Sequence, residues 1–333
     1  MNPKLVKWFE DAWYKEMYIS AWLMPWSMIY VDAIRLRRFL YRIGVLKKTK
    51  LPVPVIIVGN ITVGGTGKTP LVIWMVDFLK QQGYKPGVIS RGYAGAANTS
   101  PQAVTAESDP AQVGDEAVLL AKRCACPIVV GADRVAAGRQ LLSSNACDVL
   151  ISDDGLQHYA LERDIEIVVV DGQRRFGNGY CLPVGPLREP QERVKHVDLV
   201  VVNGPDELLE GELPMHCKGQ QLINMKTGER KPLVEFKGMA CHAVAAIGNP
   251  ARFFAQLAAA GLDCQTHALP DHHPFTAEDL QFKEPRPVLM TEKDSVKCAR
   301  FATDQYWYLP IDAELPEAFS QQLLKLLKDK AHG

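Results

Sequence analysis

The strongest constraint on the fold is a segment near position 60, where an apolar run, a glycine-rich run and a second apolar run follow one another. Val53–Val58 reads VPVIIV, and Leu71–Leu79 resumes the apolar pattern after GNITVGGTGKT. A buried strand, a loop and a helix in this order predict a P-loop, whose backbone N–H groups converge on phosphate. The loop residues expected to bind the phosphates are Thr62, Val63, Gly64, Gly65, Thr66, Gly67, Lys68 and Thr69.

Two side chains at the end of this loop carry its chemistry. Lys68 is expected to reach the β- and γ-phosphates as a point charge, and the Thr69 hydroxyl to coordinate Mg²⁺. The motif has glycine where this chain has Thr62, but Gly64 and Gly65 supply flexibility elsewhere in the loop. Nucleotide binding is therefore the first functional expectation.

Short runs rich in valine and isoleucine recur after the loop and alternate with helix-like segments at about 114–124 and 133–144. Such runs are typical of strands that are buried on both faces, and the helices between them imply right-handed crossovers. The pattern predicts a parallel α/β sheet with its ligands at the carboxyl ends of the strands. The runs are Gly87–Ser90, Pro127–Val130, Val149–Ser152, Ile165–Val170 and Leu199–Val202.

Acidic residues stand at the ends of two of these elements, after a strand and at the start of a helix. Asp153 and Asp154 come directly after a strand, as the Mg²⁺-binding acid of a P-loop protein does, although an Asp-Gly pair also marks an ordinary turn. Asp115 begins the helix at 114–124, where it is either a helix-start residue or a base facing the nucleotide. Three arginines near strand ends are candidate phosphate or substrate ligands: Arg91, Arg134 and Arg188.

The first fifty residues differ from the rest of the chain. Ten Lys and Arg against four Asp and Glu give residues 1–50 a charge of +6, whereas the whole chain is neutral. Neutrality excludes the basic excess of a dedicated nucleic-acid binder. Met17–Val31 is apolar and aromatic, but it is too short to span a bilayer, is interrupted by Pro25 and lacks a cleavage site. Its composition fits an interfacial membrane segment and a buried helix about equally.

At 333 residues the chain is expected to hold two domains. We assign residues 1–50 to a helical arm, 51–218 to a P-loop domain, 219–237 to a β-hairpin linker and 238–333 to a smaller C-terminal α/β domain. Within the last, Thr291–Asp294 either approaches the nucleotide base or caps a helix. The eight cysteines show no zinc spacing and are read as reduced, buried thiols.

The motifs taken in order resemble one family. TVGGTGKTP, SRGY, VGDEA, SDDGLQH, GPLREP, DHHPF and MTEKDSVK follow one another in this order. The ordered set is similar to that of the tetraacyldisaccharide 4′-kinases, the lipid A 4′-kinases, from the aromatic arm to about residue 300. The resemblance implies a kinase that uses ATP and Mg²⁺ to phosphorylate the 4′-hydroxyl of tetraacyldisaccharide 1-phosphate, forming lipid IVA.

The resemblance also assigns roles to residues. It makes Asp115 a catalytic base with His272 as its partner, in preference to His273, and makes Lys68 and Arg134 stabilisers of the transferring phosphoryl group. It places Thr69, Asp153 and Asp154 around magnesium. The substrate crevice is then expected to contain Arg91, Gln157, His158 and Arg188.

A lipid substrate implies a location. The resemblance favours the arm as an interfacial segment on the cytoplasmic face of a bacterial inner membrane, in a protein that acts as a monomer and binds no nucleic acid. Two other classes of protein stay open from the residues alone. They are a P-loop GTPase or ATPase switch that acts on a protein partner, and a peripheral membrane adaptor that only binds nucleotide.

Overall fold

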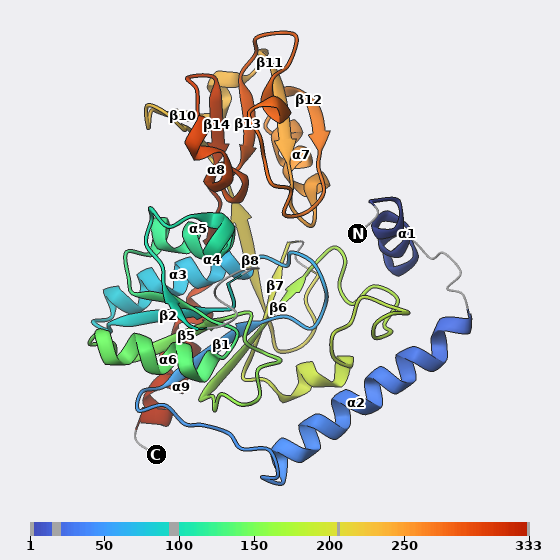
Figure 1. Cartoon of the computed structure of the whole chain (residues 1–333), viewed down its shortest axis with the longest axis vertical. Coiled ribbons are helices and arrows are strands. Elements are labelled where there is room, and N and C mark those ends of the chain that lie inside the picture. Colours follow the sequence, from blue (N-terminus) through green and yellow to red (C-terminus); the bar gives the residue numbers. More distant parts are fainter. Residues whose placement is uncertain (1–2, 15–20, 93–99, 205–206, 332–333) are drawn as a thin grey trace.

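The computed structural model describes residues 3–14, 21–92, 100–204 and 207–331. Two β-sheets with their helices form a larger and a smaller unit, stacked one above the other in Figure 1. The carboxyl ends of the parallel strands of the larger sheet point towards the smaller unit. The predicted fold class, a P-loop-type parallel sheet with a second α/β unit, is confirmed.

The larger sheet has nine strands in the order β15-β8-β7-β6-β1-β5-β2-β4-β3. From β8 to β4 all neighbouring strands are parallel, while β3 and β15 pair antiparallel at the two edges. The strands are β1 (Val55–Gly59), β2 (Pro86–Ser90), β3 (Gln102–Ala103), β4 (Ile128–Val130), β5 (Val149–Asp153), β6 (Ile165–Asp171), β7 (Leu199–Asn203), β8 (Glu212–Lys218) and β15 (Asp312–Glu314). All five runs predicted as buried strands after the loop are strands of this sheet.

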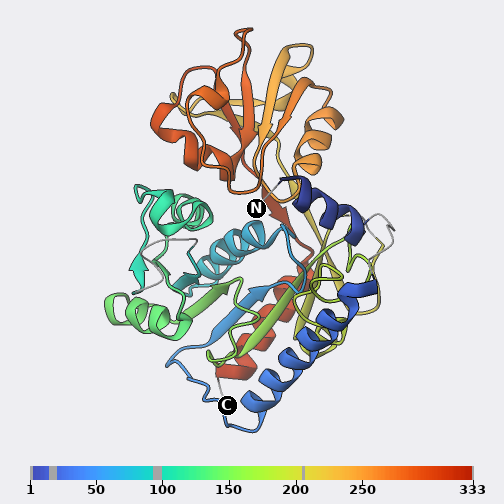
Figure 2. The same ribbon diagram turned by 45° about the vertical axis from the view of Figure 1, so that its right-hand side comes forward.

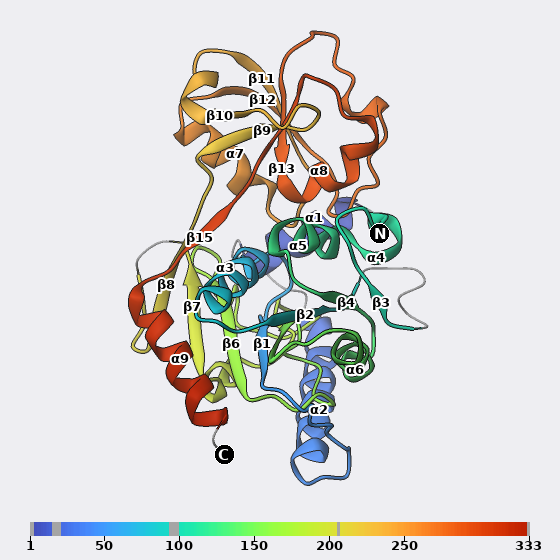
Figure 3. The same ribbon diagram turned by 90° about the vertical axis from the view of Figure 1, so that its left-hand side faces the viewer.

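Helices cover both faces of the larger sheet, which explains why β1 and β5 are buried along their whole length. On one face α3 (Lys68–Gln81), α5 (Asp115–Cys124) and α9 (Glu317–Ala331) contribute to one apolar cluster. On the other face α6 (Arg134–Ser144) packs into a second cluster, against which the partly buried Tyr30 and Val31 of the arm also pack. Short α4 (Pro110–Val113) precedes α5 (Figure 3).

The smaller unit is built on a six-stranded sheet in the order β10-β9-β14-β13-β11-β12. Helix α7 (Pro250–Ala259) packs on one face through Phe253 and Leu257, and α8 (Glu292–Cys298) follows β13 directly. The strands are β9 (Gln221–Asn224), β10 (Arg230–Pro232), β11 (Ala240–Ala245), β12 (Asp263–Ala268), β13 (Val288–Thr291) and β14 (Tyr306–Leu309). The 3₁₀ turns are η1 (Ala21–Leu23), η3 (Gln191–His196), η4 (Leu233–Phe236), η5 (Glu278–Leu280) and η6 (Ala299–Phe301).

The chain crosses between the two units twice, which differs from the division drawn from the sequence. Residues 219–237 form no separate linker, because β9 pairs with β14 and so belongs to the second sheet. The C-terminal end does not stay with the smaller unit. Strand β15 pairs with β8, and the apolar face of α9 (Phe319, Leu323 and Leu327) is buried on the larger sheet.

The arm contains α1 (Pro3–Tyr14) and the long helix α2 (Met24–Arg42), which runs along the outside of the larger unit (Figures 1 and 2). Pro25 lies in the first turn of α2, where a missing N–H costs nothing, so it begins the helix instead of interrupting it. Residues 17–20 of the predicted apolar run lie outside the described residues. Among the helices described, none combines the length and the apolar character that crossing a bilayer requires.

Candidate active site between the two sheets

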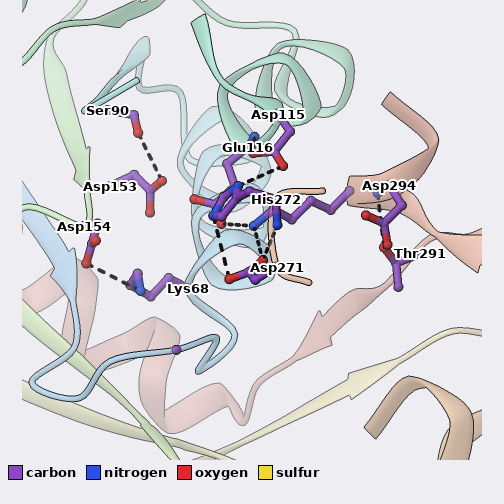
Figure 4. A network of polar contacts seen from close by, with 12 residues as sticks. Lys68, Ser90, Asp115, Glu116, Asp153, Asp154, Asp271, His272, Thr291 and Asp294 are labelled. Atoms are coloured by element: carbon purple, nitrogen blue, oxygen red, sulfur yellow. Dashed lines mark hydrogen bonds and ion pairs between the residues drawn. The ribbon is translucent and has the colours of Figure 1, made fainter. Parts of the chain in front are cut away.

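A cavity of about 800 Å³ lies between the larger and the smaller unit. Its walls come from the loop after β1, the starts of α3 and α5, the loop after β5, the arm helix α2 and the second unit. Figure 4 shows the polar side chains that meet there. The predicted residues that line the cavity are Val63, Gly64, Gly65, Thr66, Gly67, Lys68, Thr69, Arg91, Asp115, Asp154, Gln157, His158, Arg188 and His272.

Three predicted site residues do not line the cavity. Thr62 is buried and forms an isolated β-bridge with Leu187, so it holds the start of the loop in place. Asp153 and Arg134 lie just behind the cavity wall, with exposed fractions of 1% and 2%. Their charged groups can act on the cavity through the electric field or through a bound ion.

The phosphate loop has the geometry that its glycines predict. Gly67 has φ +98°, and a Cβ atom there would lie 2.2 Å from the side-chain nitrogen of Asn203, so this position requires glycine. Helix α3 begins at the next residue, Lys68, with its N-terminus directed at the loop. The loop can therefore present backbone N–H groups to an anion.

Lys68 and Asp154 form an ion pair at the centre of the cavity. The Lys68 Nζ lies 3.5 Å from Asp154 and 3.2 Å from the Asn60 Oδ1, and Arg188 contacts both oxygens of Asp154 at 3.0 and 3.2 Å. Burial opposes ionisation of Asp154, but the two cations lower its pKa well below the ordinary value. Asp154 is thus a carboxylate at neutral pH.

The surroundings of Asp153 shift its pKa in the opposite direction, upward. Asp153 is buried, and one of its oxygens, Oδ2, lies 3.4 Å from the Ser90 hydroxyl. Burial, reinforced by the nearby Glu116 carboxylate, raises the pKa of Asp153 to about 7. The Oδ1 atom is buried and has no hydrogen-bond partner among the residues that the structure describes.

These oxygens fit a magnesium ion. Mg²⁺ takes oxygen ligands and is usually held by one or two carboxylates together with phosphates and water. The unpartnered Oδ1 of Asp153 and the Thr69 hydroxyl at the start of α3 are ligands of that kind. In the part of the chain that the structure describes, no three His, Cys, Asp or Glu side chains form a ready-made metal site.

Asp115 and His272 meet across the cavity from different units (Figure 4). The His272 Nδ1 lies 3.2 Å from the Asp115 Oδ2, and Lys297 of α8 lies 3.8 Å from the same oxygen. His272 has φ +59° in the loop after β12, and its ring reaches Asp115 at the start of α5. The pairing partner of Asp115 is therefore His272, as predicted.

The charges around this pair favour an ionised Asp115. Burial raises its pKa, but the hydrogen bond with His272 and the charge of Lys293 outweigh that effect and lower the pKa to about 2. The same hydrogen bond raises the pKa of His272 above its ordinary value of 6.5, against the effect of burial. Asp115 is thus an ionised hydrogen-bond acceptor, and the His272 imidazole beside it is the donor.

This pair predicts a pH dependence of stability. Because the pKa of His272 is raised in the folded state, its contribution to stability is complete below pH 6.5 and disappears as the pH rises through the raised value. We expect the difference in unfolding free energy between wild type and His272→Gln to decrease over that range. Denaturant unfolding at a series of pH values measures it, and a difference independent of pH between 5 and 9, about the range over which histidine titrates, would contradict the pairing.

His273 has a separate partner. Its Nε2 lies 3.1 Å from Asp279, which also accepts hydrogen bonds from the backbone and the hydroxyl of Thr276 at 2.8 Å. This second acid–histidine pair lies outside the cavity lining. His273 and Asp279 thus close the turn before η5 and take no part in the contact with Asp115.

The opposite wall of the cavity is rich in positive charge. Burial and the charges of Arg134 and Arg91 lower the pKa of His158 to about 4, so its ring is neutral near pH 7. Burial lowers the pKa of Arg134 to about 10, and within the described part of the chain its Nε and Nη2 have no hydrogen-bond partner. A buried guanidinium in this state favours an anion nearby.

The sequence reasoning singled out Gln157 and Thr291–Asp294, but it missed Glu189 and Glu116, which hold Gln157 and Lys293 in place. Gln157 is held by Asn60 and by the buried Glu189, at 3.2 and 2.8 Å. Lys293 joins the two units through Glu116 at 2.9 Å, while the buried Asp294 bonds to Thr291 and to the Ala246 N–H. The Thr291 hydroxyl accepts the Asp294 N–H and so caps α8, while Thr291, Glu292 and Lys293 also line the cavity.

Comparisons with known proteins agree on one family. The sequence profile of the tetraacyldisaccharide-1-P 4′-kinases matches residues 19–328. A tetraacyldisaccharide 4′-kinase of Nitrosococcus oceani is 55% identical over 96% of this chain and 94% of its own, and one of Methylobacillus flagellatus is 49% identical over 98% of both. The solved structure of "apo" form LpxK from Aquifex aeolicus in complex with ATP covers 92% of this chain and 98% of its own, with 29% identity and a TM-score of 0.77.

Proposed function

The chain belongs to the tetraacyldisaccharide-1-P 4′-kinase family, and on that premise we propose how its own residues carry out the reaction. It is a kinase that transfers the γ-phosphoryl group of ATP to the 4′-hydroxyl of tetraacyldisaccharide 1-phosphate, in the biosynthesis of lipid A. The observation that carries the proposal is that a phosphate loop and a carboxylate–imidazole pair line the same cavity.

Asp115 orients the acceptor hydroxyl and accepts its proton. A carboxylate with a pKa of about 2 is a weak base, so the proton transfers late, when the hydroxyl oxygen is already bonding to phosphorus. Phosphoryl transfer with a loose transition state tolerates this, because most of the rate enhancement comes from positioning and charge. His272 fixes the carboxylate from the second unit and keeps positive charge beside it.

Lys68 and Arg134 stabilise the charge on the transferring group. Lys68 lies at the start of α3 and contacts the loop residue Asn60, so small side-chain rotations bring its ammonium group onto the phosphates. Arg134 acts from behind the cavity wall, where low polarity strengthens its field. Thr69, Asp153 and Asp154 would hold Mg²⁺, which supplies neutralisation of the triphosphate charge when bound.

The substrate side of the cavity lies next to the arm. Tyr30, Ile34 and Arg37 of α2 line the cavity together with Gln157 and His158. We assign recognition of the disaccharide to this wall, with Arg91 and Arg188 at its phosphate end. A lipid headgroup held here would leave its acyl chains beside α2.

Helix α2, together with the turn η1 before it, is also the proposed membrane contact; Trp22 lies in η1 and Trp26 in α2. Trp22, Trp26, Met28 and Ile29 expose 68, 61, 65 and 60% of their surface, which is unusual for large apolar side chains. Tryptophan suits the headgroup boundary, and the basic residues that follow would meet anionic lipid. We propose that the chain binds the cytoplasmic face of a bacterial inner membrane through this helix, as a monomer whose single chain completes the site.

Replacing the two exposed tryptophans tests the membrane contact. We expect Trp22→Ala/Trp26→Ala to weaken binding to anionic phospholipid vesicles by about tenfold or more, since burying each ring contributes on the order of 1.5–3 kcal/mol. Vesicle sedimentation measures this, and Val234→Ser, at an exposed apolar position of the smaller unit, is the matched control. Equal binding of the double variant and the control would contradict the proposal.

The function is tested with ATP that carries a radioactive γ-phosphate and with tetraacyldisaccharide 1-phosphate in detergent micelles. We expect label in the lipid, in an ester at the 4′ position, and only when Mg²⁺ is present. Label found only in free phosphate would support a switch protein instead. No turnover of ATP in the presence of the lipid would support a nucleotide-binding adaptor.

A further inference from the structure

A chain of hydrogen bonds connects the smaller unit to the backbone of the phosphate loop. It starts at Arg252 in the first turn of α7, passes through Asn203 at the end of β7 and ends at the carbonyl oxygen of Thr66. The Arg252 Nη2 donates to the Asn203 Oδ1 at 2.7 Å, and the Asn203 Nδ2 donates to the Thr66 oxygen at 2.9 Å. None of these contacts is needed for the steps described above.

The Asn203 side chain is buried between these two partners. Its exposed fraction is 2%, and both polar atoms of its amide are used in the two bonds. Gly67 passes so close that any side chain there would overlap the Asn203 amide. The Asn203 amide thus packs against the backbone just before Lys68. Its position restricts the backbone conformations of the loop.

Arg252 depends on the position of the second unit. The side-chain oxygen of Asn249 receives the Arg252 N–H at 3.4 Å and so fixes the start of α7. The Arg252 guanidinium is about one-third exposed, and its Nη1 lies 4.0 Å from the buried Asp171 at the end of β6. Among the described residues the Oδ2 atom of Asp171 has no hydrogen-bond partner, and the charge of Arg252 partly compensates it. Movement of the second unit would change both contacts.

A second contact of the same unit reaches the same loop. At Gly248, next to Asn249, a Cβ atom would lie 3.3 Å from the Gly65 nitrogen and 3.6 Å from the Gly64 Cα. The backbone of the smaller unit therefore packs directly on the glycines of the phosphate loop. The smaller unit thus reaches the loop at two positions, directly at Gly248 and through Asn203 at Arg252.

We propose that Arg252 and Asn203 are positioning residues, through which the smaller unit sets the shape of the phosphate loop and hence its affinity for a triphosphate. The proposal rests on the proposed function only in that the cavity binds ATP. When the second unit is in place, Thr66 is held and the loop N–H groups are preorganised. When the link is broken, the loop must be ordered by the nucleotide itself, which lowers affinity.

The test compares two probes, ATP and inorganic tripolyphosphate, each bound to the full chain with Mg²⁺ and without lipid. We expect Arg252→Met to weaken binding of both probes by the same factor, on the order of tenfold, because a hydrogen bond with a charged donor is lost. Arg252→Lys should restore part of the affinity, since an ammonium group can still donate to Asn203. Arg286→Met, which removes another partly exposed arginine of the same unit, should leave both affinities at the wild-type value.

Asn203→Leu provides the second arm, because leucine has a similar volume but can make neither bond. In this background Arg252→Met should cause no further loss, and isothermal calorimetry of the four proteins measures the coupling. Three results would overturn the proposal: additive losses, a loss for ATP alone, or affinities of Arg252→Met within twofold of wild type. Lipid is absent from these measurements, so their failure is independent of whether the kinase reaction itself is confirmed.

Discussion

Replacing Asp115 by asparagine is expected to lower kcat for lipid phosphorylation by about 10² to 10⁴, the usual contribution of general base catalysis. Asparagine keeps the shape of the side chain and a carbonyl oxygen for His272, but it cannot take the proton of the acceptor hydroxyl. The KM for ATP should change little, since Asp115 is proposed to contact the acceptor and not the phosphates. Initial rates at saturating lipid measure both constants.

The chain contains a matched control for this variant. Asp279 pairs with His273 at 3.1 Å, much as Asp115 pairs with His272, but it lies outside the cavity lining. Asp279→Asn should therefore keep kcat close to the wild-type value. If both variants lost activity equally, the loss would come from folding of the loop, and the assignment of Asp115 as the base would be wrong.

Replacing Lys68 by methionine is expected to lower kcat by roughly 10² to 10³, the typical cost of removing one preorganised group that stabilises transition-state charge. Methionine keeps the apolar stem and removes the ammonium group that lies between Asn60 and Asp154. Loss of this cation should also remove a competitor of Mg²⁺ for the Asp154 carboxylate, which Arg188 still keeps ionised. At saturating ATP we expect the variant to need less Mg²⁺ for half-maximal rate.

Lys80 is the corresponding control on the same helix. It lies in the last turn of α3 and donates to the carbonyl oxygens of Cys124 and Ala125, away from the cavity. Lys80→Met should lower the melting temperature and leave kcat and the Mg²⁺ requirement unchanged. A wild-type Mg²⁺ requirement in Lys68→Met would contradict the electrostatic link between Lys68 and Asp154.

The larger sheet could be predicted because its signals are local. Valine and isoleucine runs such as Val149–Ser152 are buried on both faces, and the loop before Lys68 fixes where one strand ends and a helix begins. Since parallel strands end at a common edge, Asp154 and the phosphate loop had to be neighbours. The parts of the site built on this edge follow from the order of elements alone.

The second crossing of the chain could not be predicted in the same way. Helix α9 carries an apolar stripe that would fit either unit, and its packing of Phe319 on Trp74 is a contact between residues far apart in the sequence. The pairing of β15 with β8 likewise has no local signature. A strand of three residues shows no pattern from which its partner can be deduced.

The site residues that the sequence did not indicate also depend on contacts between distant parts of the chain. Arg252, Asn203 and Glu189 are ordinary in their local sequence, and each acquires its role from contacts across more than thirty positions. His272 was assigned by resemblance, and its link to Asp115 spans 157 residues. The sequence indicated which chemistry to look for, whereas the connections between the units required the structure.

The central claim is that Asp115 from the larger unit and His272 from the smaller one act as a single catalytic pair. A double-mutant cycle with Asp115→Asn and His272→Gln, read as kcat for transfer of the γ-phosphoryl group to the lipid, tests it most directly. We predict that the double variant is no slower than Asp115→Asn alone, because the imidazole acts only through the carboxylate. If the two losses multiply, the residues act independently, and the account of a pair shared between the units is contradicted.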